Sequence, residues 1–232
     1  MSHNQTGRYF KYAIGEILLV VVGILIALQI NNWNQERQKR AKEQLYLISF
    51  QNDLIQNSIE LQRVIDKTER IKKRADSVLL LKQGILEYLS DNSFTRCVMG
   101  GNGFTIYQAQ GGTVKSLIAS GDLNVISNDS LRLALATWED NLLGVKEWEM
   151  LLKTSSQGYK NYLDQHLDLI AIDEQRLPIN TSVRIQLMNS QLFLNHVSNT
   201  KRLSRILNSV YEEKMEQLQA LQIRVDDAIN SF

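Results

Sequence analysis

Two acidic residues on either side of a histidine come closest to a metal site in this sequence. Asp164, His166 and Asp168 alternate with other residues, and imidazole and carboxylate groups are common zinc ligands. On a helix, however, Asp164 and Asp168 share one face and His166 does not. His166 falls instead on an apolar stripe, so the pattern predicts a core histidine rather than a metal ligand.

A glycine-rich stretch raises the possibility of phosphate binding. Gly112, Thr113, Lys115 and Ser116 are close together. A phosphate-binding loop places a glycine directly before the lysine and follows a strand, so that backbone amides, lysine and hydroxyl converge on the phosphates. Val114 interrupts that order here, and the motif therefore does not indicate nucleotide binding.

The remaining reactive side chains carry no catalytic signature. Cys97 is the single cysteine, and the three histidines are scattered along the chain, so neither a thiol nor a serine triad can be assigned. We expect no catalytic residue, no metal ligand and no cofactor, and we expect that the protein is not an enzyme.

One charged residue lies inside an apolar run near the N-terminus. Ionisable groups within a membrane are costly and often functional, which makes Glu16 a candidate for assembly or ion movement. The alternative is that Glu16, about one turn inside the run, reaches the headgroup region. Gly23 and Ala27, with Gly15 two turns earlier, form a small-residue face that could pack against another membrane helix.

A basic stripe offers a possible docking surface further along the chain. Arg63, Lys67, Arg70 and Arg74 recur at helical spacing and could bind an acidic partner. The alternative is a solvated face whose charges pair along the helix, with Asp66 next to Arg70 and Glu69 next to Lys73 in space.

The apolar run is long enough to cross a bilayer. Residues 12–30 contain one charge and span about 28 Å as a helix. No small-residue cleavage pattern follows them, so we predict an uncleaved signal anchor. Lys and Arg are more numerous after the run than before it, which favours a cytoplasmic domain, although long domains translocate largely regardless of charge.

The opening segment resembles a known family. Residues 12–34 read YAIGEILLVVVGILIALQINNWN and look like the start of a family of uncharacterised, single-pass Bacteroidota membrane proteins that carry a domain of unknown function. A second stretch, around Leu117, Gly121 and Asn128, is similar to a looser family pattern. The resemblance implies a cytoplasmic N-terminus and a periplasmic domain at the inner membrane, although the basic arm before the helix is shorter here than in many members.

The rest of the chain predicts long helices. It has one proline among 232 residues, and proline is the strongest helix breaker. We expect an all-α fold: a short arm (1–11), a transmembrane helix (12–31), a long amphipathic helix (32–90), a helical cap inserted at 91–180 and a C-terminal long helix (181–232). The two long helices should pair antiparallel, with near-heptad spacing typical of a coiled coil.

Apolar residues suggest which faces of these helices are buried. On the first long helix the expected core positions are Leu45, Ile48, Ile55, Ile59, Ile65, Ile71, Val78 and Leu79. Gly121 is expected to end a helix, Asn128 or Asp129 to begin the next, and Gly158 to break it.

These features favour a membrane-anchored helical interaction or scaffold module, extracytoplasmic, whose partners are the lipid bilayer and either copies of itself or other membrane proteins. Balanced acidic and basic totals, 25 and 26, argue against nucleic acid. Two alternatives remain: a subunit of a transport or ion-coupled assembly that uses Glu16, and a ligand sensor that binds in the cap.

Overall fold

A computed structural model describes residues 6–82, 89–138, 140–174 and 178–232, with side chains from residue 13 onward. The described part is mainly helical and contains no strand, which confirms the all-α prediction. The helices are α1 (Thr6–Leu80), α2 (Asp91–Gly100), α3 (Gly112–Ser120), α4 (Asp129–Ala136), α5 (Leu143–His166), α6 (Leu169–Asp173), α7 (Thr181–Asn189) and α8 (Gln191–Asn230), with short 3-10 turns η3 (Asp122–Val125) and η4 (Asp140–Leu142).

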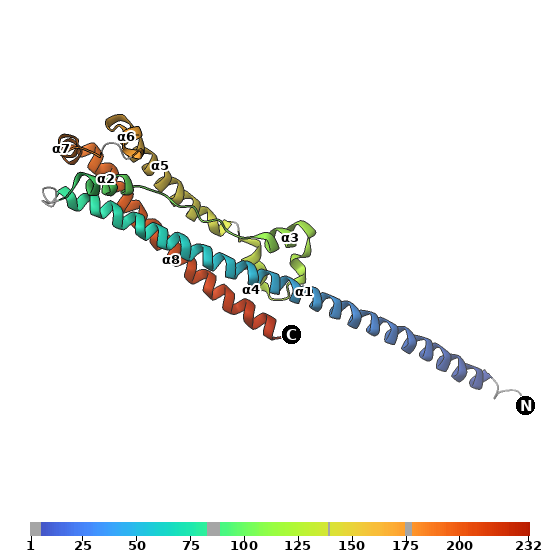
Figure 1. Ribbon diagram of the computed structural model, residues 1–232. Helices are drawn as coiled ribbons and strands as arrows, with labels where there is room; N and C mark the ends of the chain where they lie inside the picture. Colours follow the sequence, from blue (N-terminus) through green and yellow to red (C-terminus); the bar gives the residue numbers. More distant parts are fainter. Residues whose placement is uncertain (1–5, 83–88, 139, 175–177) are drawn as a thin grey trace, which may run out of the picture.

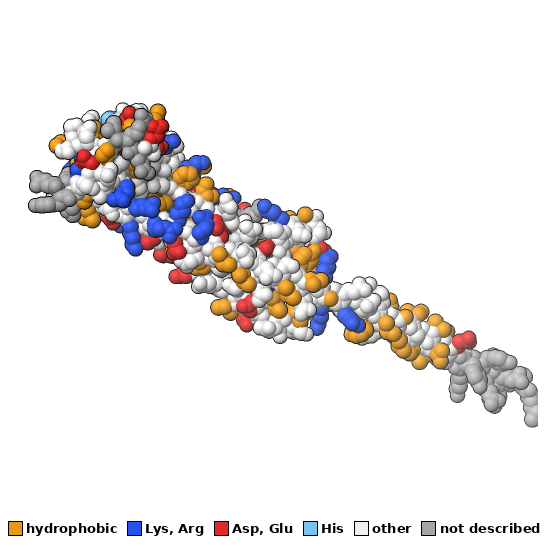
Figure 2. All heavy atoms as spheres, in the orientation of Figure 1, with side chains coloured by type: hydrophobic (Ala, Val, Ile, Leu, Met, Phe, Trp, Pro, Cys, Tyr) orange, Lys and Arg blue, Asp and Glu red, His pale blue; other side chains and the backbone are white. Residues whose placement is uncertain are grey.

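The N-terminal part of α1 projects alone from the bundle (Figure 1). Residues 13–42 are all exposed, and within the described residues α1 is the one helix long and apolar enough to cross a membrane. Figure 2 shows hydrophobic side chains covering the outer part of this projecting segment. The helix continues without a break into the bundle, so the candidate membrane span and the first bundle helix form one rod.

The prediction of an antiparallel long-helix pair is confirmed by α1 and α8. Gln51 donates to Asp226 at 2.7 Å, and Lys201 forms an ion pair with Asp76. The same number of residues separates these positions on each helix, which fixes an antiparallel register. Phe232 lines a pocket together with Lys39 and Arg40 of α1, so the C-terminus returns toward the projecting segment.

Buried residues on both helices alternate at intervals of four and three. On α8 they include Val197, Thr200, Ser204 and Leu207, a spacing that keeps one seam facing the partner helix. On α1 the buried positions from Glu43 to Val78 are Glu43, Leu47, Phe50, Leu54, Asn57, Leu61, Val64, Thr68, Ile71, Ala75 and Val78.

These buried positions correct the core prediction for residues 45–59 of α1. Leu45, Ile48, Ile55 and Ile59 were expected in the core, but all four are exposed. The helix carries two apolar stripes here, and α8 packs against the other one, which contains Phe50, the residue that meets Trp138 edge to face at 5.7 Å.

The segment predicted as a small cap contributes a third long helix. α5 packs along α8, and its residues Leu152 and Tyr159 are fully buried. Gly158 was expected to break this helix, yet it lies within it. A Cβ atom at Gly158 would lie 3.0 Å from the ring of His196 on α8, so the glycine permits close packing of α5 on α8.

Several helix ends are observed where the sequence predicts them, with one additional break near the C-terminus. Asn128 caps α4, Asn180 caps α7, and Gly121 ends α3 with a left-handed φ of 71°. The C-terminal range 181–232 was expected as one helix, but it divides at Ser190, whose side chain accepts a hydrogen bond from the amide of Phe193 and starts α8. The predicted first-helix end near residue 90 adjoins 83–88, which lie outside the described residues.

Candidate functional site

An extended segment in the middle of the bundle contacts both α1 and α5. We call residues 101–111 the strap. Its side chains alternate: Thr105 and Tyr107 are buried, whereas Phe104, Ile106 and Gln108 are exposed. The strap has no strand partner, so its backbone groups must be satisfied by side chains.

Asn57 of α1 makes the main attachment of the strap. Its Nδ2 donates to the carbonyl of Gln110 and its Oδ1 accepts from the amide of Gln110, both at 2.7 Å. The same Oδ1 accepts from the Tyr107 hydroxyl at 2.7 Å. Asn57 is fully buried, so one amide side chain satisfies three polar groups of the strap.

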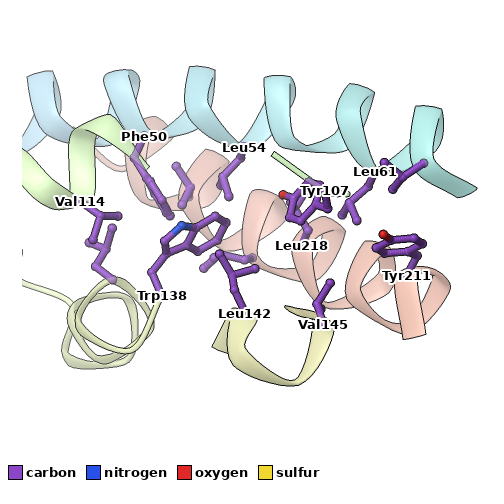
Figure 3. Close-up of a cluster of buried hydrophobic side chains, with 14 of the residues drawn as sticks. Phe50, Leu54, Leu61, Tyr107, Val114, Trp138, Leu142, Val145, Tyr211 and Leu218 are labelled. Atoms are coloured by element: carbon purple, nitrogen blue, oxygen red, sulfur yellow. The ribbon is translucent and has the colours of Figure 1, made fainter. Parts of the chain in front are cut away.

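Glu149 of α5 holds the strap from the opposite side. Its Oε1 accepts from the amide of Tyr107 and from the hydroxyl of Tyr211, both at 2.7 Å. Burial raises the pKa of Glu149, although both hydrogen bonds oppose that shift. Figure 3 shows Tyr107 and Tyr211 among the apolar side chains of this core, which includes Leu61 and Val145.

This buried carboxylate has no catalytic partner among the described residues. The adjoining pocket has a volume of about 180 Å³, and its lining includes Lys115, Trp138 and Glu149 but no histidine, serine or cysteine. Glu149 accepts a hydrogen bond from the strap backbone, and Asn57 both donates to that backbone and accepts from it. Their sequence gave no signal of this role, because isolated polar residues on a helix usually face water.

The basic stripe is exposed on α1, next to the strap. Arg63, Lys67, Arg70 and Arg74 all face solvent. Figure 2 shows Lys and Arg side chains gathered on the half of the bundle remote from the projecting helix. Arg63 pairs with Glu60, Nε to Oε2 at 2.6 Å, and the guanidinium lowers the pKa of Glu60.

The other three cations of the stripe are unpaired within the described residues. The expected pair of Glu69 with Lys73 forms at 3.7 Å, but Asp66 accepts from Gln62 instead of meeting Arg70. The self-paired alternative for this face therefore holds for Arg63 and Lys73 and not for Lys67, Arg70 and Arg74.

Two exposed apolar side chains of the strap lie close to Arg63 and to Lys153. Arg63 Nη2 donates to the carbonyl of Ile106 at 3.4 Å, and Lys153 Nζ of α5 lies 5.9 Å from the centre of the Phe104 ring. Phe104 and Ile106 are 39% and 43% exposed. We call the group Arg63, Lys67, Arg70, Arg74, Phe104, Ile106 and Lys153 the distal basic surface.

Sequence reasoning found the cations of this surface and missed its apolar members. Phe104 and Ile106 alternate with Thr105 and Tyr107, a period of two that indicates an extended segment. Their neighbours could not be inferred, because the strap meets α1 only after the chain has returned through α2.

The candidate metal and phosphate sites are not assembled. His166 is exposed and stacks on Tyr162, so the core histidine prediction is wrong. Asp168 caps α6 by accepting from Ala171. No three His, Cys, Asp or Glu side chains in the described chain could share a metal ion.

The start of α3 is already occupied by a carboxylate. Asp53 Oδ2 accepts from the amide of Thr113 at 2.9 Å, where a phosphate would have to bind. Cys97 is half-buried, and burial raises the pKa of its thiol, which disfavours the reactive thiolate.

The membrane-helix candidates lie on the projecting part of α1. Gly15, Glu16, Gly23 and Ala27 are all exposed, and a Cβ atom at either glycine would meet nothing within 4 Å. This face is therefore open to a second helix.

The comparisons with known proteins identify a family whose function is unknown. No curated protein and no solved structure matches this chain. A candidate N-terminal membrane helix and a domain of unknown function are compatible with a membrane-anchored module. Residues 16–143 match a family of unknown function, DUF6090, so the chain belongs to this family.

Proposed function

We propose that this protein is a non-enzymatic, membrane-anchored interaction module that presents the distal basic surface to an acidic partner. The observation that carries the proposal is the set of three unpaired cations, Lys67, Arg70 and Arg74. They share a helix face with Arg63, which contacts the strap at the exposed Ile106. Protein interfaces commonly combine apolar and aromatic side chains with arginine, and unpaired cations steer acidic partners.

The bilayer itself is a poor candidate for this partner. Lys67 lies about 50 Å along the helix from Asn34, and α1 is continuous over that distance. Charges more than a few Debye lengths from a surface are screened, and this length is about 8 Å at physiological salt. The proposal therefore places the partner at the far end of the rod.

Site-specific photocrosslinking tests the docking role. A photoreactive phenylalanine analogue at Ile106 of the full-length chain, in its native membrane, is expected to yield an adduct of discrete mass. The Lys67→Glu/Arg70→Glu double variant should remove that adduct, because it reverses two unpaired charges of the surface.

A matched variant controls for net charge. Arg202→Glu/Arg205→Glu reverses two exposed charges on α8 and should leave the adduct unchanged. The proposal fails if no adduct forms at Ile106, or if both double variants affect it equally.

We also propose that the N-terminus is cytoplasmic and that the bundle lies outside the inner membrane. The resemblance of residues 12–34 supports this orientation. Ser77 is exposed on the bundle part of α1, so Ser77→Cys in a Cys97→Ser background supplies an accessible thiol. A membrane-impermeant maleimide should label it in intact spheroplasts, and labelling only after lysis would contradict the orientation.

A further inference from the structure

Residues 45–59 of α1, where the helix enters the bundle, carry an apolar stripe that no described part of the chain covers. Leu45, Ile48, Ile55 and Ile59 are 68%, 40%, 38% and 60% exposed. With the exposed Asn52 they recur at alternating intervals of three and four residues. We call these five residues the outer stripe. Such spacing places side chains along one seam that faces another helix.

The part of α1 that bears the outer stripe is also nearly free of charge. Between residues 44 and 59 the single charged side chain is Asp53, which accepts from the Thr113 amide inside the structure. The exposed neighbours Ser49 and Gln56 are neutral. Depletion of charged residues marks the core of protein interfaces, whereas a solvated helix face normally carries them.

The outer stripe continues the face of the candidate membrane span. Ala27 precedes Leu45 by about five full turns of an α-helix, so both project from the same side of the continuous α1. Gly23 lies one turn earlier and about 40° away. The small residues of the span and the apolar residues of the bundle thus form one open face.

We propose that a second copy of this chain covers the outer stripe, forming a parallel dimer along α1. The proposal rests on the membrane anchorage in the proposed function, because two copies in one bilayer are held parallel and at high effective concentration. In a parallel pair each position meets its own counterpart. Leu45, Ile48, Ile55 and Ile59 then bury apolar surface, and no charge repels its twin.

Asn52 selects the same arrangement. In heptad terms Leu45, Asn52 and Ile59 occupy equivalent positions, of the kind at which a lone asparagine pairs with its counterpart and fixes a two-stranded parallel register. An antiparallel or heterologous contact would leave the Asn52 amide facing an apolar side chain, at the cost of its hydrogen bonds.

Single-cysteine crosslinking in native membranes tests the dimer. In a Cys97→Ser background, Leu45→Cys and Asn52→Cys should each form a disulfide-linked homodimer under mild oxidation. Gln219→Cys, exposed on α8, is the control. Because only the seam brings identical positions together, the dimer yield should be roughly tenfold higher at Leu45 and Asn52. Equal yields at all three positions would overturn the proposal.

A disruptive variant gives an independent readout. Ile48→Lys/Ile55→Lys places like charges opposite each other and should abolish the Asn52→Cys crosslink. Its thermal unfolding midpoint should stay near that of the parent, because both positions are exposed within one copy. An unchanged crosslink would refute the seam.

Carbonate extraction of the same membranes separates the two proposals. If the chain stays in the membrane but crosslinks no better at Leu45 and Asn52 than at the control position, the dimer alone is refuted. A chain that carbonate releases refutes the anchorage in the proposed function, and with it the membrane-imposed alignment. If the chain with unaltered surface charges forms no Ile106 photoadduct while the Leu45 crosslink persists, the docking role alone is refuted.

Discussion

Replacing Asn57 by alanine should loosen the strap from α1. The substitution removes the donor and acceptor of Gln110 and the acceptor of the Tyr107 hydroxyl. It leaves the helix intact, since alanine is the best helix former. The effect therefore measures the attachment of the strap rather than the stability of α1.

The loss in the free energy of unfolding depends on whether each group that loses its hydrogen bond can bind water instead. The Tyr107 hydroxyl lies in a buried residue and loses its acceptor, which costs about 1–3 kcal/mol. Gln110 is exposed, so water can replace its two lost bonds at about 0.5 kcal/mol each. We expect a total loss of about 2–4 kcal/mol in the free energy of unfolding.

Urea unfolding of the full-length chain in detergent micelles, followed by tryptophan fluorescence, measures this loss. Trp138 reports on the same core, where it contacts Phe50. Gln56→Ala, at the exposed position next to Asn57, controls for helix propensity. If Asn57→Ala unfolds within about 0.5 kcal/mol of Gln56→Ala, Asn57 does not hold the strap.

Two further predictions concern the same bundle. Burial raises the pKa of Glu149 above its ordinary value of 4.5, so its contribution to stability is full below that value and declines as pH rises through the raised pKa. Glu149→Gln should therefore lose less stability than the parent as the pH of urea titrations is raised above 4.5, and parallel curves would contradict this. Gly144→Ala in α5, which meets nothing within 4 Å, should raise the unfolding free energy by up to about 1 kcal/mol. Gly158→Ala should not raise the unfolding free energy, because the new Cβ would lie 3.0 Å from the His196 ring. In a His196→Ala background, which removes that ring, the gain should appear. Thermal unfolding that shows the same gain for both glycine substitutions in the parent chain would refute the packing argument.

The features predicted well from the sequence are those that depend on near neighbours. The apolar run gives the candidate membrane helix directly, because its length and composition suffice. The caps at Gly121 and Asn128 follow from hydrogen bonds that reach only a few residues. The exposed basic stripe was found for the same reason, since its members share one helix face.

The features that were missed depend on contacts between distant residues. Leu45 and Leu47 belong to different stripes of α1, and both stripes are apolar, so local periodicity cannot decide which one α8 covers. Asn57, Tyr107, Glu149 and Tyr211 come from four separate parts of the chain, and nothing in their spacing links them. No glycine or proline lies near the helix break at Ser190, so the sequence did not predict the break.

In a chain anchored by the candidate span, the unbroken course of α1 turns small movements in the bilayer into large ones at its far end. Arg74 lies about 65 Å along the helix from Ile30, and α1 has no hinge between them. Membrane helices tilt by about 20° on average, and a tilt of that size carries Arg74 sideways by about 20 Å. A single copy would thus sweep its basic end over a wide arc above the bilayer. Two copies joined along α1 would brace each other and narrow that arc, so that pairing near the membrane controls where the remote end can reach.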